Sequence, residues 1–168
     1  MKKQILKQKL LINKIPSNLI IDEWIYHYII GEDGETKREK ALIFVNRLYS
    51  YKGSILILED SPFDNKIKLL TKNTDARVRE ISKMLSIGIL LDSKKTVRVS
   101  EKELKPLSKR LLKIIPGDDQ YLIRLFLYKK NSCIITSDTR LVGVLRNEKY
   151  IKIMLHDDFV NQYMPVNH

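Results

Sequence analysis

Short apolar runs alternate along this chain with longer segments of helical periodicity, and this alternation restricts the fold more than any other feature. Runs of strand length occupy residues 18–21, 55–58, 96–99, 133–136 and 151–155. Between them, apolar residues recur every three or four positions, as they do from Trp24 to Ile29. Strands joined by helices form right-handed crossovers and a parallel sheet. We therefore expect an α/β fold, a three-layer α/β/α sandwich with a mainly parallel central sheet.

The helical segments have recognisable beginnings and ends. Ser61, Pro62 and Asp64 form a helix start, with a capping hydroxyl, a proline at the first position and an acid at the third. Pro106 removes an interior hydrogen bond, and we expect it to kink its helix. Helices are predicted at residues 24–30, 37–49, 61–72, 75–87, 100–115, 119–130 and 140–146, with a terminal turn or helix at 158–163.

Length and charge narrow the class of protein. The chain of 168 residues fits one domain, 1–168, with a basic arm or helix at residues 1–15. Its formal net charge of +11 favours an acidic partner such as RNA, DNA or a membrane surface, although a lysine-rich surface can also reflect composition alone. The single cysteine, Cys133, excludes an internal disulfide and fits a reducing compartment. No stretch approaches the roughly 18 apolar residues of a membrane span, so we expect a cytoplasmic protein with no membrane partner.

Acidic residues follow several of the apolar runs or begin the helices near them. Asp22, Glu59 and Asp138 come directly after or just beyond strand-like runs, and Asp119 begins a helix. Parallel strands place their carboxyl ends on one edge of a sheet, where open α/β folds bind their ligands. Carboxylates gathered there repel one another, and a hard divalent cation relieves that repulsion. The pattern predicts a site for Mg²⁺ or Mn²⁺.

Each acid also has a purely structural interpretation. Asp22 and Asp138 each precede a helix and can cap it, a role that is compatible with metal ligation. Asp118 and Asp119 precede a helix with one apolar face. At about 100° per residue, Asp119 falls near the centre of that face and should point toward the sheet. Asp118 lies nearly a quarter-turn from the centre of that face, so we expect it to cap the helix from the solvent side and Asp119 to be the ligand.

A fourth acid is harder to assign. Asp64 is explained by its capping box with Ser61, and Glu59 ends its run at the correct edge but can simply be solvated. Both interpretations stay open for each residue. The histidines show no metal spacing, and the chain has no glycine-rich phosphate loop and no Cys/His zinc pattern.

Three segments together resemble the PIN-domain nucleases, in matching order over residues 18–163. They are the opening strand, acid and aromatic helix "IIDEWIYHYIIG", the later block "GDDQYLIRLFLYKKNSCIITSDTRL", and the closing strand "YIKIMLHDDF". Two features depart from the family pattern. Glu23 stands where the family usually has Thr or Ser, and the family's middle Glu has only Asp64 near its position.

The resemblance implies cleavage of single-stranded RNA by acids that hold Mg²⁺ or Mn²⁺. It assigns metal ligation to Asp22, Asp119 and Asp138, and a catalytic role to these three with Asp64 as the fourth acid. It also implies, for toxin members, an antitoxin peptide as partner and a homodimer. Arg140, just beyond Asp138, is the first candidate for a phosphate contact, or else a surface arginine.

Two other functional classes are compatible with an α/β fold of this kind. A non-catalytic nucleic-acid-binding domain with an eroded acidic site would explain Glu23 and the missing middle Glu. A receiver-like or phosphatase domain would need a phosphate-accepting Asp with a partner Lys after a later strand, and the chain has no such block.

Overall fold

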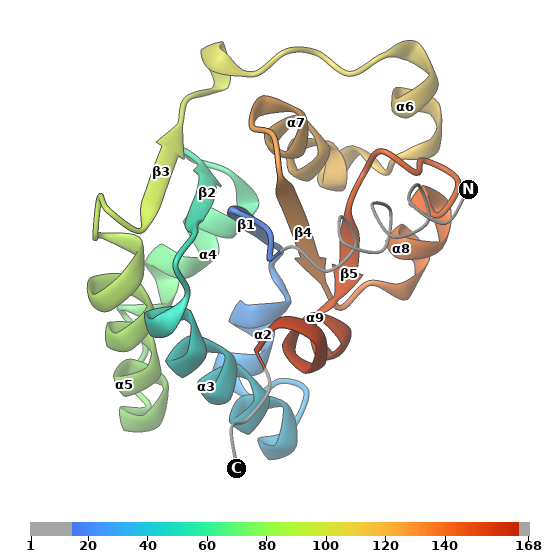
Figure 1. The fold of residues 1–168 in the computed structure, drawn as a ribbon. Coiled ribbons are helices and arrows are strands. Elements are labelled where there is room, and N and C mark those ends of the chain that lie inside the picture. The colour runs from blue at the N-terminus through green and yellow to red at the C-terminus, as the bar shows by residue number, and fades with distance from the viewer. Residues whose placement is uncertain (1–14, 165–168) are drawn as a thin grey trace.

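A parallel sheet lies at the centre of the molecule (Figure 1). The computed structural model describes residues 15–164. Within them the strands are β1 (Asn18–Ile21), β2 (Ser54–Leu58), β3 (Thr96–Val99), β4 (Ser132–Thr136) and β5 (Ile153–Leu155). They lie in the order β3-β2-β1-β4-β5, and every neighbouring pair is parallel. The expected α/β class and three-layer sandwich are confirmed. The basic arm or helix predicted at residues 1–15 falls, except for Ile15, outside the described residues.

Helices cover the sheet in two groups. The α-helices are α2 (Trp24–Ile30), α3 (Glu35–Ser50), α4 (Pro62–Leu70), α5 (Ala76–Leu85), α6 (Lys109–Ile114), α7 (Gln120–Tyr128), α8 (Thr139–Leu145) and α9 (His156–Tyr163). Helices α2 to α5 pack against one another, with α4 on β2, while α7 contacts β1, β2 and β4, and α8 and α9 contact β5 (Figure 1). None of the helices within residues 15–164 is long and apolar enough to cross a bilayer.

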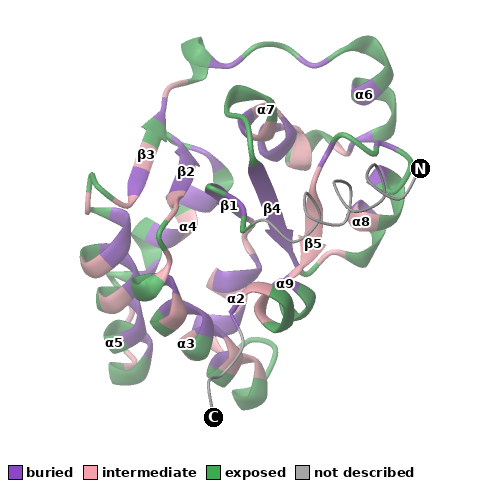
Figure 2. Cartoon of the chain, in the orientation of Figure 1, coloured by how far each residue is buried: buried purple, intermediate pink, exposed green. Residues whose placement is uncertain are grey.

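The central strands are buried on both faces, as Figure 2 shows in purple. Every residue of β1 and β4 is buried, and Leu19, Ile20, Ile134 and Ile135 have no exposed surface. Continuous apolar runs are typical of strands covered by helices on both sides of a parallel sheet. Cys133 is one of these fully buried residues, which agrees with its expected place in the core.

Two predicted helices differ from the structure. The single kinked helix expected at residues 100–115 is wrong, because only a short 3-10 turn, Glu101–Glu103, and α6 are helical there. Pro106 lacks an amide proton and disfavours helical geometry at the residue before it. The segment between the 3-10 turn and α6 is therefore not helical. The helix predicted at 75–87 is α5, extended by a π-helical turn at Ser86–Leu90.

The strand order creates a switch point between β1 and β4. From β1 the chain builds outward through β2 to β3, and it then crosses back to place β4 on the other side of β1. Loops that leave the carboxyl ends of β1 and β4 therefore diverge, and in open α/β sheets the ligand site lies in the crevice this divergence leaves. Asp22 follows β1, and Asp138 follows β4 by one intervening residue.

Candidate metal and nucleic-acid site

Strand register places Asp22 beside Thr136 at the switch point. Ile21 pairs with Ile135 in the ladder, so the next residue of each strand is adjacent to the other. The Thr136 hydroxyl donates a 2.6 Å hydrogen bond to Asp22 Oδ2, and the Glu23 amide donates one of 2.6 Å to Asp22 Oδ1. The Asp22 carboxylate is thus held in one orientation by groups from both strands.

Asp138 joins the same network through its backbone and caps a helix with its side chain. Its amide donates to the Thr136 hydroxyl at 3.0 Å. Its Oδ1 accepts from the amides of Arg140 at 2.7 Å and Leu141 at 3.0 Å, so the capping interpretation is correct. Within residues 15–164, Oδ2 accepts no hydrogen bond and stays available to a ligand.

Asp119 begins α7 without capping it. Its side chain is half-buried and makes no capping hydrogen bond, whereas Asp118 is exposed. The expected phase difference between the two acids is confirmed. The expectation that Asp118 caps the helix is wrong, because Asp118 lies in the 3-10 turn Gly117–Asp119 and its side chain bonds to no amide of the described chain.

Burial and neighbouring negative charges raise the pKa of two acids at this edge, Asp119 and Asp22. Burial is the largest cause that raises the pKa of Asp119, to about 6, and the other causes are the negative charges of Asp22, Asp138, Asp118 and Glu23, in that order. Burial is also the main cause that raises the pKa of Asp22, with smaller contributions from Glu23 and Asp138, although the Thr136 and Glu23 hydrogen bonds oppose the shift. Asp22, Asp119 and Asp138 therefore share one region of negative potential.

Tyr121 adds a buried hydroxyl to this region, a residue that no sequence pattern singles out. It is 9% exposed, and its hydroxyl lies next to the backbone of Phe63 without a well-formed hydrogen-bond partner in residues 15–164. Burial is the largest cause that raises the pKa of Tyr121, and the negative charges of Asp22, Glu23 and Asp119 raise it further. The hydroxyl is therefore close to the acids while it bonds to none of them.

Lys66 brings a cation to the acidic edge from α4. Its ammonium forms an ion pair with Glu23 and lies 2.9 Å from Nε2 of His27. Nδ1 of His27 in turn lies 2.5 Å from Glu32. The pair partly compensates the extra negative charge that Glu23 brings beside Asp22.

Asp64 has a different environment from the other three acids. It is buried, and its carboxylate lies 3.0 Å from Arg98 and 2.9 Å from Lys68. Burial alone would raise its pKa, but the hydrogen bonds from Lys68 and Arg98 outweigh burial and lower it. Asp64 is not among the charges that chiefly raise the pKa of Asp22 or Asp119. The structure therefore brings Asp22, Asp119 and Asp138 within electrostatic range of one another and places Asp64 in a separate ion-pair cluster.

The residues suit a divalent cation in chemistry but do not form a closed cage. Carboxylate oxygens are the donors that Mg²⁺ and Mn²⁺ prefer. In the part of the chain that the structure describes, no three His, Cys, Asp or Glu side chains come close enough together to hold a metal ion. Binding would thus need waters to complete the coordination, and Mg²⁺ commonly retains several of its waters.

Comparison with known proteins adds no relative to this description. No family model matches the chain, and neither the curated proteins nor the solved structures contain a significant match.

Proposed function

We propose that this protein is a metal-dependent endoribonuclease that cleaves single-stranded RNA at the carboxyl edge of its sheet. The observation that carries the proposal is the meeting of Asp22 and Asp138 at the switch point, where the Thr136 hydroxyl bonds the Asp22 carboxylate and the Asp138 amide. The half-buried Asp119 lies within electrostatic range of both, and their charges contribute to its raised pKa. Mutual repulsion of carboxylates costs stability, and a divalent cation converts it into binding energy. The resemblance of the same three acids to the PIN-domain pattern supports this assignment.

Asp22, Asp119 and Asp138 would hold the ion, each in a different way. The hydrogen bond from Thr136 fixes Asp22, and capping of α8 fixes Asp138 so that Oδ2 is its free ligand atom. Burial and the neighbouring negative charges raise the pKa of Asp119 to about 6, and a bound cation would favour its carboxylate form. A bound Mg²⁺ or Mn²⁺ supplies a Lewis acid for the phosphate charge and a water of lowered pKa.

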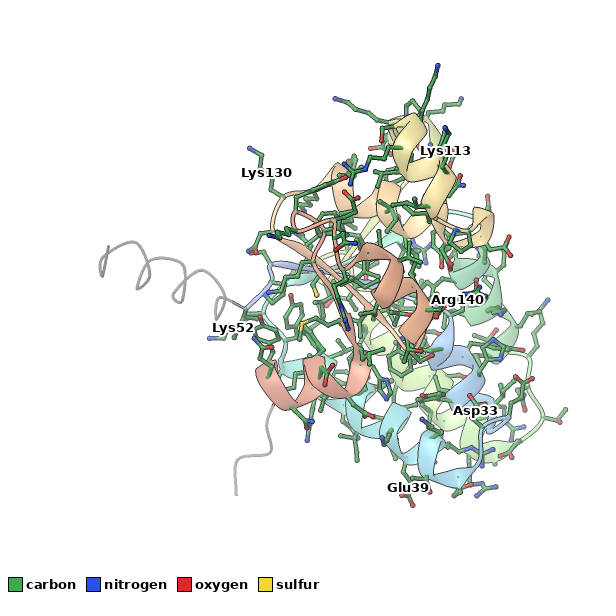
Figure 3. All side chains as sticks on the ribbon, turned by 90° about the vertical axis from the view of Figure 1, so that its right-hand side faces the viewer. Asp33, Glu39, Lys52, Lys113, Lys130 and Arg140 are labelled. Atoms are coloured by element: carbon green, nitrogen blue, oxygen red, sulfur yellow. The ribbon has the colours of Figure 1, made fainter. Side chains whose placement is uncertain are left out.

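Two cations beside the acids would contact the RNA backbone. Lys66 lies at the edge in an ion pair with Glu23. Arg140 is exposed on α8, two residues beyond Asp138 (Figure 3). Phosphate contacts of this kind position a strand without reading its sequence. The formal net charge of +11 supports an acidic substrate.

Cleavage of a mixed pool of single-stranded RNA, with Mn²⁺ or with EDTA, tests the proposal. We expect cleavage only with Mn²⁺, and a melting temperature that rises with Mn²⁺ concentration because the ion binds the folded state alone. A melting curve that neither Mn²⁺ nor EDTA moves, together with uncut RNA, would reject the nuclease and its metal site.

The second candidate is a non-catalytic nucleic-acid-binding domain with an eroded acidic site. The two cations on Asp64 and the ion pair between Glu23 and Lys66 favour it, because both place lysine or arginine where a nuclease would keep bare carboxylates. Such a domain would bind RNA equally in Mn²⁺ and in EDTA and cut none of it.

A toxin role is a narrower form of the first proposal. It would add an antitoxin peptide across the acidic edge, a homodimer and a cytoplasmic location. Co-purification of the chain with the product of the neighbouring gene, and loss of RNA cleavage in that complex, would support the toxin form. Unchanged cleavage in the complex would reject it.

A further inference from the structure

A cavity lined by cations lies at the opposite, amino edge of the sheet. Its volume is about 1140 Å³, and it spans the starts of β1, β2 and β4. Arg47, Lys52, Lys129 and Lys130 line it, and no Asp or Glu of the described chain does. Lys52 and Lys130 lie on the left of Figure 3, whereas Arg140 lies right of its centre.

These four cations have no counter-charge among residues 15–164. None of their side chains forms an ion pair or a hydrogen bond within residues 15–164. Elsewhere on the surface, lysines and arginines such as Lys40 and Arg110 do pair with acids. Like charges gathered without partners repel one another, and a bound polyanion relieves that repulsion.

The remaining lining favours a nucleic acid over an acidic peptide. Tyr51 and Tyr163 are partly exposed in the wall, and the Tyr51 hydroxyl is fixed by a hydrogen bond to the Pro16 carbonyl. Aromatic rings interleaved with cations are typical of surfaces that stack bases and track a phosphate backbone. Ser17 and Asn46 add polar groups suited to phosphate and sugar oxygens.

We propose that this cavity binds the backbone of single-stranded RNA, separately from the acidic edge. The two sites lie at opposite ends of β1, which has four residues and is therefore about 13 Å long. The cavity needs no metal, and it lies outside the acid cluster, so it can bind RNA whether or not the protein cleaves it.

The test measures binding of a fluorescein-labelled oligouridylate in EDTA, with Asp119→Asn in every protein so that no cleavage occurs. One variant combines Lys52→Gln, Lys129→Gln and Lys130→Gln. The matched control combines Lys72→Gln, Lys83→Gln and Lys113→Gln, three exposed lysines that lie outside the cavity and have no ion pair in the described chain. Each triple lowers the formal net charge from +11 by three.

The cavity triple should weaken binding at least tenfold, and the slope of log affinity against log salt should fall by about 2 because three phosphate contacts are lost. The control triple should leave the slope nearly unchanged. Lysine-to-arginine changes at the same three cavity positions should keep both affinity and slope, which excludes misfolding as the cause. Equal losses in the two glutamine triples would overturn the proposal, since binding would then follow net charge alone.

Competition distinguishes nucleic acid from other polyanions. Unlabelled oligouridylate should displace the probe at lower charge concentration than polyglutamate does. Equal displacement by polyglutamate would overturn the assignment to RNA and indicate an acidic protein segment instead. Because every arm is free of metal, failure of this proposal leaves the proposed Mn²⁺-dependent cleavage untouched.

Discussion

The Thr136 hydroxyl donates to Asp22 at 2.6 Å while it accepts the amide of Asp138 at 3.0 Å. One side chain thus joins the carboxyl ends of β1 and β4 at the switch point. It also opposes burial, because its hydrogen bond lowers the pKa of Asp22 that burial raises. The hydrogen bond favours the carboxylate form of Asp22, which is the form that binds a cation.

Thr136→Val should remove this link without changing the shape of the side chain. Asp22 would lose a donor and its pKa would rise further, and the amide of Asp138 would lose its acceptor. We expect the free energy of unfolding to fall by about 1–3 kcal/mol, which chemical denaturation would measure, and cleavage to fall with it. Thr136→Ser keeps the hydroxyl and is the control. Equal stability and activity in Val and wild type would contradict the role given to Thr136.

Much of the fold could be predicted from the sequence, because the central strands are continuous apolar runs. The runs ending at Ile21 and Thr136 are β1 and β4, and the alternation with helices gave the parallel sheet. The regular leucine spacing from 100 to 115 predicts one helix that Pro106 only kinks. Pro106 instead interrupts the helical structure, because it lacks an amide proton and disfavours helical geometry at the residue before it.

The candidate site was only partly predictable for a different reason. Asp22 and Asp138 are adjacent to strands, so their place at the edge follows from strand direction. The phase of α7 likewise separates Asp119 from Asp118. The partners of Asp64 depend on Arg98, which lies 34 residues away on β3, and no local pattern reports that contact. The same holds for the ion pair between Lys66 on α4 and Glu23 at the start of α2.

Asp119→Asn and Asp118→Asn should show which of the two acids is a metal ligand. Both changes remove one negative charge at the start of α7, but only Asp119 is half-buried beside Asp22. We expect Asp119→Asn to abolish Mn²⁺-dependent cleavage and Asp118→Asn to keep most of it, as measured on single-stranded RNA. If Asp118→Asn is inactive and Asp119→Asn active, the ligand assignment must move by one residue.

The stability of the metal-free protein should depend on Asp119 between about pH 4 and pH 6. Its folded pKa of about 6 lies above its usual 3.8, so the folded state binds the proton more tightly than the unfolded state. The free energy of unfolding should therefore fall as pH rises through this window, by on the order of 1 kcal/mol because solvent screens a half-exposed carboxylate. Asp119→Asn should lack this component and be the more stable protein at pH 7. Identical pH profiles of unfolding for wild type and Asp119→Asn would show that the shared negative potential is absent.

Asp64→Asn distinguishes an ion-pair residue from a fourth catalytic acid. Asp64 is buried between Arg98 and Lys68, and its lowered pKa means that it stabilises the fold above its unfolded pKa and loses that contribution as pH falls through the folded value. The change should lower the free energy of unfolding at neutral pH by about 1–2 kcal/mol, since it leaves two cations without their shared carboxylate. The difference from wild type should shrink toward acidic pH, and chemical denaturation at several pH values would follow it.

Cleavage by the folded Asp64→Asn variant should stay within about threefold of wild type, a difference in barrier below 1 kcal/mol. If cleavage is lost while the variant remains folded, Asp64 acts in the reaction despite its two cations, and the acidic site extends from β1 and β4 to α4.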